Sequence, residues 1–142
     1  MDQSRNLRPF HLAIPVLDLL KTRLFYTEVL GFEEGRSSNN WVDLNFYGHQ
    51  VVLHQVDKLE QTADNPVDGH QVPVPHFGVV LSMNDWEALA QRLRVANVKF
   101  IIEPHIRFKG QAGEQATMFF KDPSGNALEF KAFHDLSGLF EK

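Results

Sequence analysis

The chain has 142 residues, 43% hydrophobic and 23% charged, a composition that fits one ordinary globular domain and excludes collagen-like, low-complexity and wholly disordered chains. Its net charge of -4, with no run of basic residues, argues against nucleic acid and anionic membranes as partners. The absence of cysteine excludes disulfides, thiolate nucleophiles and cysteine metal sites, so any metal needs His, Asp or Glu ligands.

No targeting segment or membrane span is predicted. The N-terminal residues carry charge but lack the apolar core of a secretory leader. No later segment approaches the ~20 apolar residues that span a bilayer. We therefore expect a cytoplasmic protein.

The first part of the chain predicts a strand, a helix and three short strands. Residues 9–16 alternate large apolar side chains with small or polar ones, as in a strand with two different faces. Asp18 is the candidate N-cap of the helix, and Gly31 follows its end. The predicted apolar stripe of this helix contains Leu17, Leu20, Leu24 and Phe25. The strands are expected at about 32–36, 41–47 and 50–56.

Residues 57–75 are polar and rich in proline, and we predict a connecting loop. The same order of elements then repeats, beginning with a strand at His76. A helix capped by Ser82 or Asn84 follows, with Trp86, Leu89, Ala90, Leu93 and Ala96 on one face. Strands are expected at about 99–102, 116–121 and 126–133.

The repeated order predicts a single α+β domain, residues 1–142, with β-α-β-β-β modules at 8–56 and 76–133 joined by the linker 57–75. The eight strands are expected to form one curved mixed sheet, because both modules bury large residues on one face. The helices would cover the convex side and leave a polar concave side.

Strand parity places three candidate metal ligands, His11, His76 and Glu129, on the smaller-residue faces of their strands. Their predicted neighbours on those faces are Ala13, Gly78, Val80 and Ala127. The opposite faces would carry Phe10, Leu12, Phe77, Val79, Leu128 and Phe130. Two histidines and one carboxylate are the ligand set of non-haem Fe(II) oxygenases. Each residue taken singly has a plainer interpretation as a hydrogen-bonded or solvated strand residue.

Four motifs resemble the vicinal oxygen chelate superfamily of glyoxalase I, fosfomycin and bleomycin resistance proteins and extradiol dioxygenases. They are Phe10-His-Leu-Ala-Ile-Pro-Val, Phe25-Tyr-Thr-Glu-Val-Leu-Gly-Phe32, Pro75-His-Phe-Gly-Val-Val-Leu and Asp122-Pro-Ser-Gly-Asn-Ala-Leu-Glu-Phe130. The resemblance implies a sheet curved around a metal cleft, with His11, His76 and Glu129 as ligands. It also implies a divalent ion that activates two vicinal oxygens of a small-molecule substrate, and a homodimer.

The position of Val52 distinguishes branches of the superfamily. Glyoxalase I enzymes add a fourth ligand there, and valine cannot ligate. The intact triad and the stretch beginning at Arg107 resemble small two-unit proteins predicted to be extradiol dioxygenases. We therefore expect an Fe(II) ring-cleaving dioxygenase, with Mn, Ni or Zn as alternative metals. The alternative functions are a glyoxalase-like lyase or isomerase, a thiol transferase and a non-catalytic small-molecule binder.

Three further residues are candidates for the reaction itself. His54 has the strand parity of Val52 and is a candidate general base, with a solvent-facing strand end as the alternative. Arg107 and Lys109 lie in a segment that contains glycine and are candidates for binding an anionic substrate group. The plainer alternative for both is a charged loop surface.

Overall fold

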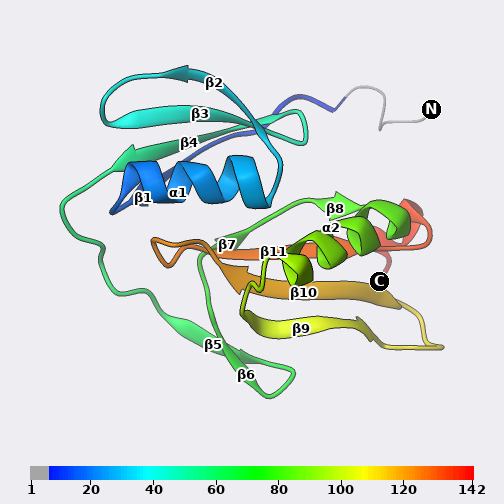
Figure 1. The fold of residues 1–142 in the computed structure, drawn as a ribbon. Coiled ribbons are helices and arrows are strands. Elements are labelled where there is room, and N and C mark those ends of the chain that lie inside the picture. The colour runs from blue at the N-terminus through cyan, green and yellow to red at the C-terminus, as the bar shows by residue number, and fades with distance from the viewer. Residues whose placement is uncertain (1–6) are drawn as a thin grey trace. The chain divides into compact units, whose positions relative to one another are not determined.

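The computed structural model describes residues 7–142, and the chain divides into two compact units, residues 1–59 and 60–142. The first six residues, part of the charged N-terminal segment considered above, lie outside the described residues. Each unit has its own sheet and its own helix (Figure 1). Within residues 7–142, no helix is long and apolar enough to cross a membrane.

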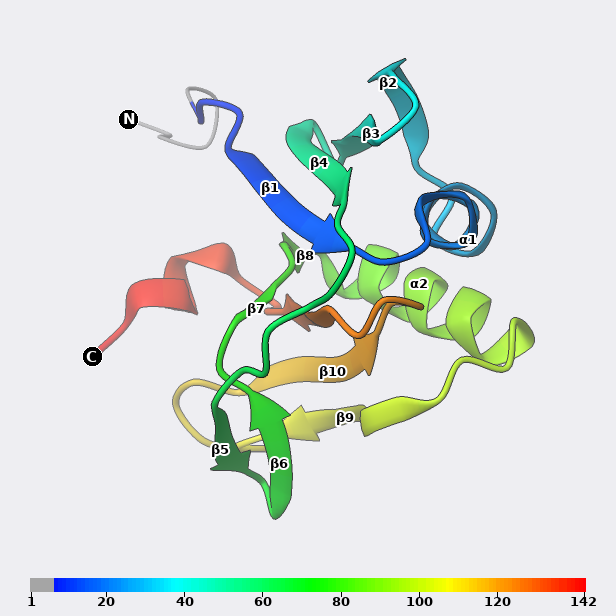
Figure 2. The same ribbon diagram turned by 90° about the vertical axis from the view of Figure 1, so that its left-hand side faces the viewer.

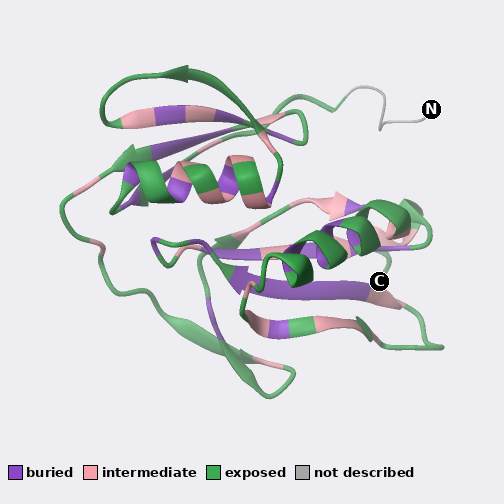
Figure 3. Ribbon diagram, in the orientation of Figure 1, coloured by how far each residue is buried: buried purple, intermediate pink, exposed green. Residues whose placement is uncertain are grey.

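Unit 1 is a four-stranded sheet with the order β1-β4-β3-β2 and the helix α1 against one face. Its strands are β1 (His11–Val16), β2 (Glu33–Ser37), β3 (Trp41–Phe46) and β4 (His49–Gln55). β1 runs parallel to β4, and the other pairs are antiparallel. Buried and more exposed residues alternate along β1 and β3 (Figure 3), which confirms their two-faced character. Phe10 is 65% exposed because it precedes β1, so its predicted burial is wrong.

α1 (Leu19–Leu24) begins as predicted at Asp18, whose carboxylate accepts a hydrogen bond of 3.0 Å from the amide of Lys21. It continues into a π-helical turn, η2 (Phe25–Val29). The predicted apolar stripe is wrong, since Leu17, Leu20 and Leu24 are exposed. Leucines occur on both sides of this short helix, so spacing alone selects no face. The buried residues are instead Leu19, Thr22, Tyr26 and Leu30.

Unit 2 contains a five-stranded sheet, the helix α2 (Met83–Val95) and a final 3-10 helix, η3 (Leu136–Phe140). β9 (Phe100–Arg107), β10 (Gln115–Lys121) and β11 (Ala127–Ala132) are antiparallel neighbours. β9 extends well beyond the strand predicted at 99–102. Two short strands, β7 (His76–Phe77) and β8 (Val80–Leu81), both pair in parallel with β11.

α2 confirms its sequence prediction. Ser82 caps it by accepting a hydrogen bond from the amide of Asp85. The indole Nε1 of Trp86 donates to the carbonyl of Phe130 at 3.0 Å, which fixes the helix to β11. Its buried face contains Trp86, Leu89, Ala90 and Leu93, as expected, but Ala96, the fifth predicted member, is the exposed C-cap residue.

The predicted connecting loop 57–75 is wrong, because it contains a β-hairpin of β5 (Asp64–Val67) and β6 (His70–Pro73) that contacts β9 (Figure 2). Asp68 and Gly69 form its two-residue turn with φ values of 49° and 81°, the left-handed conformation that tight hairpins require. Two of the prolines that indicated a loop, Pro66 and Pro73, lie in this two-stranded ribbon, and Pro75 follows it. Strand pairing gives each unit its own sheet, so the single eight-stranded sheet around a metal cleft stays a prediction.

Candidate functional site

His76 and Glu129 lie side by side on neighbouring strands of unit 2. Nε2 of His76 is 3.5 Å from Oε1 of Glu129. Nδ1 of His76 is 2.8 Å from the carbonyl oxygen of Pro73. Because a carbonyl oxygen only accepts, Nδ1 carries the hydrogen of the neutral ring and Nε2 presents a lone pair towards Glu129.

The Glu129 carboxylate is fixed from its other side. Its Oε2 accepts a hydrogen bond of 2.6 Å from the hydroxyl of Thr117 on β10, and Thr117 is completely buried. The Glu129 side chain is itself only 11% exposed. Oε1 is therefore the oxygen that faces His76, while Oε2 is held by the protein.

Two further residues shape this half of the site. The ring of Phe119 packs edge-on against the His76 imidazole, with 5.0 Å between centroids. Gly78 separates β7 from β8, and a Cβ at this position would overlap the carbonyl oxygen of Glu129. The sequence therefore needs glycine here to bring the strand that carries His76 close to the strand that carries Glu129.

His11 in unit 1 is also oriented through its Nδ1 atom, by a contact with one side chain. Its Nδ1 is 2.8 Å from the amide oxygen of Gln50 on β4, which is directly opposite in the register. The amide oxygen also only accepts, so Nε2 of the neutral His11 ring presents its lone pair. Val52, two residues beyond Gln50, supplies no ligand.

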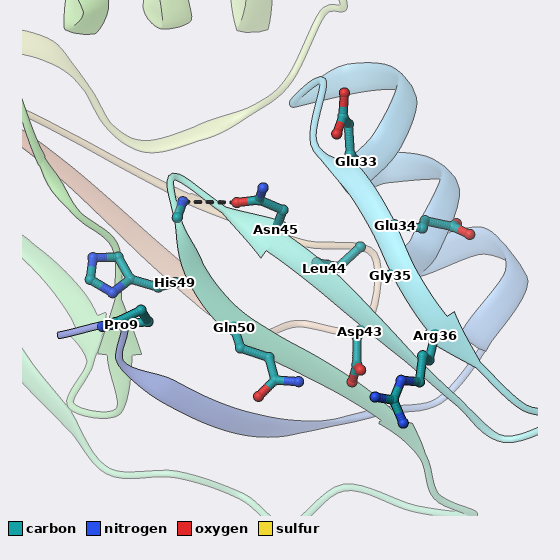
Figure 4. A pocket seen from close by; sticks show the side chains of 11 residues that line it. Pro9, Glu33, Glu34, Gly35, Arg36, Asp43, Leu44, Asn45, His49 and Gln50 are labelled. Carbon is teal, nitrogen blue, oxygen red and sulfur yellow. Dashed lines mark hydrogen bonds between the residues drawn. The ribbon is translucent and has the colours of Figure 1, made fainter.

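A pocket of about 440 Å³ opens on the unit 1 sheet (Figure 4). A bulge in β2 after Glu34 shifts the register against β3, and the side chains of Arg36 and Asp43 project on the same side of the sheet. Gln50 lines the pocket and also contacts His11, so the pocket borders this candidate ligand. Charged and polar residues predominate among those that line it.

The remaining predicted residues are His54, Arg107 and Lys109. His54 is exposed near the end of β4, two residues beyond Val52. Nε of Arg107 is 2.9 Å from Oδ2 of Asp68, so its charge is already opposed by a carboxylate. Lys109 is exposed in the segment between β9 and β10.

Three groups that orient the candidate ligands were not predicted from the sequence: the hydroxyl of Thr117, the amide of Gln50 and the carbonyl of Pro73. Thr117 had a detectable signal, because it is the only polar residue in the buried run 116–120 of β10. The backbone carbonyl had none. Over residues 7–142, neither unit alone gathers three His, Asp or Glu side chains into a metal-binding group.

Comparison with known proteins identifies the family. Residues 8–130 match the model of the glyoxalase/bleomycin resistance protein/dioxygenase superfamily. The chain is 29% identical over 124 residues to the virulence protein STM3117 of Salmonella typhimurium, covering 87% of this chain and 82% of that protein. It is 30% identical over 129 residues to the glutathione transferase FosA of Serratia marcescens, covering 91% of this chain and 80% of that protein.

A solved structure agrees with this assignment. A glyoxalase/bleomycin resistance protein/dioxygenase from Alicyclobacillus acidocaldarius has a TM-score of 0.78 and 30% sequence identity, and the match covers 94% of this chain and 96% of that one. The resemblance of the two modules to this superfamily is therefore confirmed. The chain belongs to the glyoxalase/bleomycin resistance protein/dioxygenase superfamily.

Proposed function

We propose that the protein is an enzyme that uses a divalent metal ion, bound by His11, His76 and Glu129, to act on a small molecule with two neighbouring oxygens. One observation carries the proposal: the lone pair of His76 Nε2 and the carboxylate oxygen Oε1 of Glu129 face each other at 3.5 Å. The Glu129 side chain is only 11% exposed and its other oxygen is held by Thr117, so this pair is oriented and shielded from water in a way that suits a shared cation.

The donor set fits a metal ion. Bonds of ~2.0–2.2 Å from nitrogen and oxygen ligands can span the His76–Glu129 separation. Both Nδ1 hydrogens are held by acceptors, at Pro73 for His76 and at Gln50 for His11, which is how proteins orient metal-binding histidines. A bound divalent ion would polarise substrate oxygens and stabilise negative charge that develops on them.

Addition of a thiol to an electrophile is the first candidate reaction. The specific support is the 30% identity to a protein named a glutathione transferase, over 91% of this chain. Within this proposal the two histidines and Glu129 keep the metal in place, and the pocket beside Gln50 accommodates the polar part of a substrate. Lys109 remains a candidate for an anionic substrate group, and Arg107 would serve only if the substrate replaced Asp68 as its partner.

Ring cleavage by an Fe(II) dioxygenase is the second candidate. Its support is the ligand set itself, because two histidines and one carboxylate leave coordination positions for a diol and for dioxygen. His54 would then serve as the general base on a substrate hydroxyl.

We also propose a homodimer, which light scattering at micromolar concentration tests.

The test begins with anaerobic purification and metal analysis of the full chain. We expect about one divalent ion per chain, with Mn²⁺ or another non-iron ion for the transferase and Fe²⁺ for the dioxygenase. Thiol consumption with glutathione and a panel of electrophiles, and ultraviolet absorption with a panel of catechols, then separate the two reactions. A chain that neither retains nor takes up any divalent ion would overturn the proposal.

A further inference from the structure

The β5–β6 hairpin leads directly into the strand that carries His76. Its second strand ends at Pro73, and the carbonyl of that residue is the acceptor for His76 Nδ1. The hairpin is closed at its base by a hydrogen bond of 2.7 Å from the amide of Val74 to the carbonyl of Ala63. Movement of β6 therefore moves the group that orients the imidazole.

A small apolar cluster holds the hairpin against the main sheet of unit 2. Val72 of β6, Ile102 of β9 and Phe119 of β10 are all buried together, with Val67 and Ile101 packed against them. Phe119 is also the ring that contacts His76. The position of the hairpin is thus linked to His76 through both the Pro73 carbonyl and the Phe119 ring.

The tip of the hairpin is joined to β9 by charge. Oδ2 of Asp68 lies 2.9 Å from Nε of Arg107 and 3.4 Å from Nε2 of His105. The Nε–H group of Arg107 is not aligned for a hydrogen bond, so the attraction is electrostatic. His105 Nδ1 is 2.9 Å from the carbonyl of Glu103, which leaves a lone pair on Nε2 of the neutral ring. Arg107 is therefore the permanent partner of Asp68.

We propose that Asp68 is a positioning residue for His76: its ion pair with Arg107 holds the hairpin on β9 and so aims the Pro73 carbonyl at His76 Nδ1. The consequence for metal binding rests on the proposed function, because it requires His76 to be a ligand. The inference also assigns Arg107 to the hairpin instead of a substrate anion. The hairpin was predicted as an unstructured linker, so this role follows from the structure alone.

Asp68→Asn removes the negative charge of this residue but keeps the hairpin turn. Asp68 has a φ of 49°, and asparagine adopts this left-handed conformation readily, so the variant keeps the hairpin turn. Arg107→Gln removes the other partner. Asp64→Asn is the matched control, since it removes the same charge from an exposed position of the same hairpin.

The primary measurement uses metal-free protein with ¹⁵N-labelled histidine at a pH where the imidazoles are neutral. In the unmodified chain we expect His76 almost entirely as the Nδ1–H tautomer. In Asp68→Asn and Arg107→Gln the Nε2–H fraction should rise about two- to fivefold, the range that a partly exposed ion pair supports, and faster exchange of the β6 amides should accompany it. Asp64→Asn should match the unmodified chain.

The second measurement is the affinity for Co²⁺ by calorimetry, where the same two variants should bind about two- to fivefold more weakly. An unchanged His76 tautomer in both variants would overturn the inference, whatever the metal affinity. A tautomer shift in a chain that binds no Co²⁺ at all would support the positioning role and overturn the proposed function instead.

Discussion

The two units present the same strand register with different chemistry. In unit 1, His11 on β1 is paired with Gln50 on β4, and Val52 lies two residues further along. In unit 2, His76 on β7 is paired with Ala127 on β11, and Glu129 lies two residues further along. Val52 and Glu129 therefore occupy equivalent positions in the two registers.

Under the proposed ligand set, this difference gives unit 2 more of the candidate ligands than unit 1. The carboxylate of unit 2 is replaced by an apolar side chain in unit 1, so unit 1 contributes one candidate ligand and unit 2 contributes two. The two units also differ two residues beyond each histidine. Unit 1 has Ala13 at this position, and unit 2 has Gly78, where a Cβ would overlap the backbone of Glu129. We infer that the close approach of strands at Gly78 is the feature that brings His76 and Glu129 together.

Gly78→Ala should produce the largest change in stability. The new Cβ would overlap the carbonyl oxygen of Glu129, so β7 and β8 must separate from β11. We expect the free energy of unfolding to fall by about 2–3 kcal/mol, measured by urea denaturation. Ala13→Gly, the reciprocal change in unit 1, should cost at most about 1 kcal/mol. Equal effects of the two substitutions would contradict the comparison.

Thr117→Val should weaken metal binding and lower the free energy of unfolding by about 1–2 kcal/mol, because the nearly buried Glu129 carboxylate loses a donor. The substitution keeps the shape of a buried side chain but removes the hydroxyl that donates to Glu129 Oε2. Loss of such a supporting hydrogen bond lowers metal affinity by about tenfold or somewhat more, which Co²⁺ calorimetry measures. Thr117→Ser retains the hydroxyl and should bind nearly as the unmodified chain does. Normal affinity in Thr117→Val would show that this hydrogen bond does not orient the ligand.

Gln50→Leu should have a smaller effect in unit 1. It removes the acceptor for His11 Nδ1, but both side chains are exposed and water can replace the amide oxygen. We expect Co²⁺ affinity to fall by about two- to threefold. Gln50→Glu keeps an acceptor at the same place and serves as the control. An effect as large as that of Thr117→Val would mean that unit 1 orients its ligand as tightly as unit 2.

Glu34→Gln should have the smallest effect. Arg23 donates hydrogen bonds of 2.9 and 2.6 Å to Glu34, and they lower the pKa of this carboxyl. A lowered pKa in the folded state means that the ion pair stabilises the protein above the ordinary pKa of glutamate and loses this effect as the pH falls through the lowered value. The pair is partly exposed, so unfolding at neutral pH should show a loss below about 0.5 kcal/mol that disappears in acid.

The sequence predicted most of the elements because their signals are local. Alternation along β1 and β3, the caps Asp18 and Ser82 and the apolar face of α2 all depend on neighbouring residues. The predictions that failed concern features that depend on contacts between residues far apart in the sequence. The hairpin at 64–73 depends on packing of Val72 against Ile102, and the buried face of α1 depends on which side of the helix meets the sheet.

The candidate ligands could be predicted from the sequence, but the groups that orient them could not. Strand parity placed His76 and Glu129 on one face, and the structure brings them to 3.5 Å. The groups that orient them were not predictable, because the Pro73 carbonyl has no side-chain signature and Thr117 approaches Glu129 only through the pairing of β10 with β11. The ion pair of Arg107 with Asp68 likewise depends on the unexpected hairpin.

Metal stoichiometry of single-site variants tests the central claim most directly. The full chain and the variants His11→Ala, His76→Ala, Glu129→Ala and Val52→Ala would be loaded with Co²⁺, desalted and analysed, with circular dichroism confirming the fold. We predict about one ion per chain for the unmodified protein and Val52→Ala, and loss of most binding in the other three. Full metal retention in His76→Ala or Glu129→Ala would contradict the account, because unit 2 would then not supply the two ligands assigned to it.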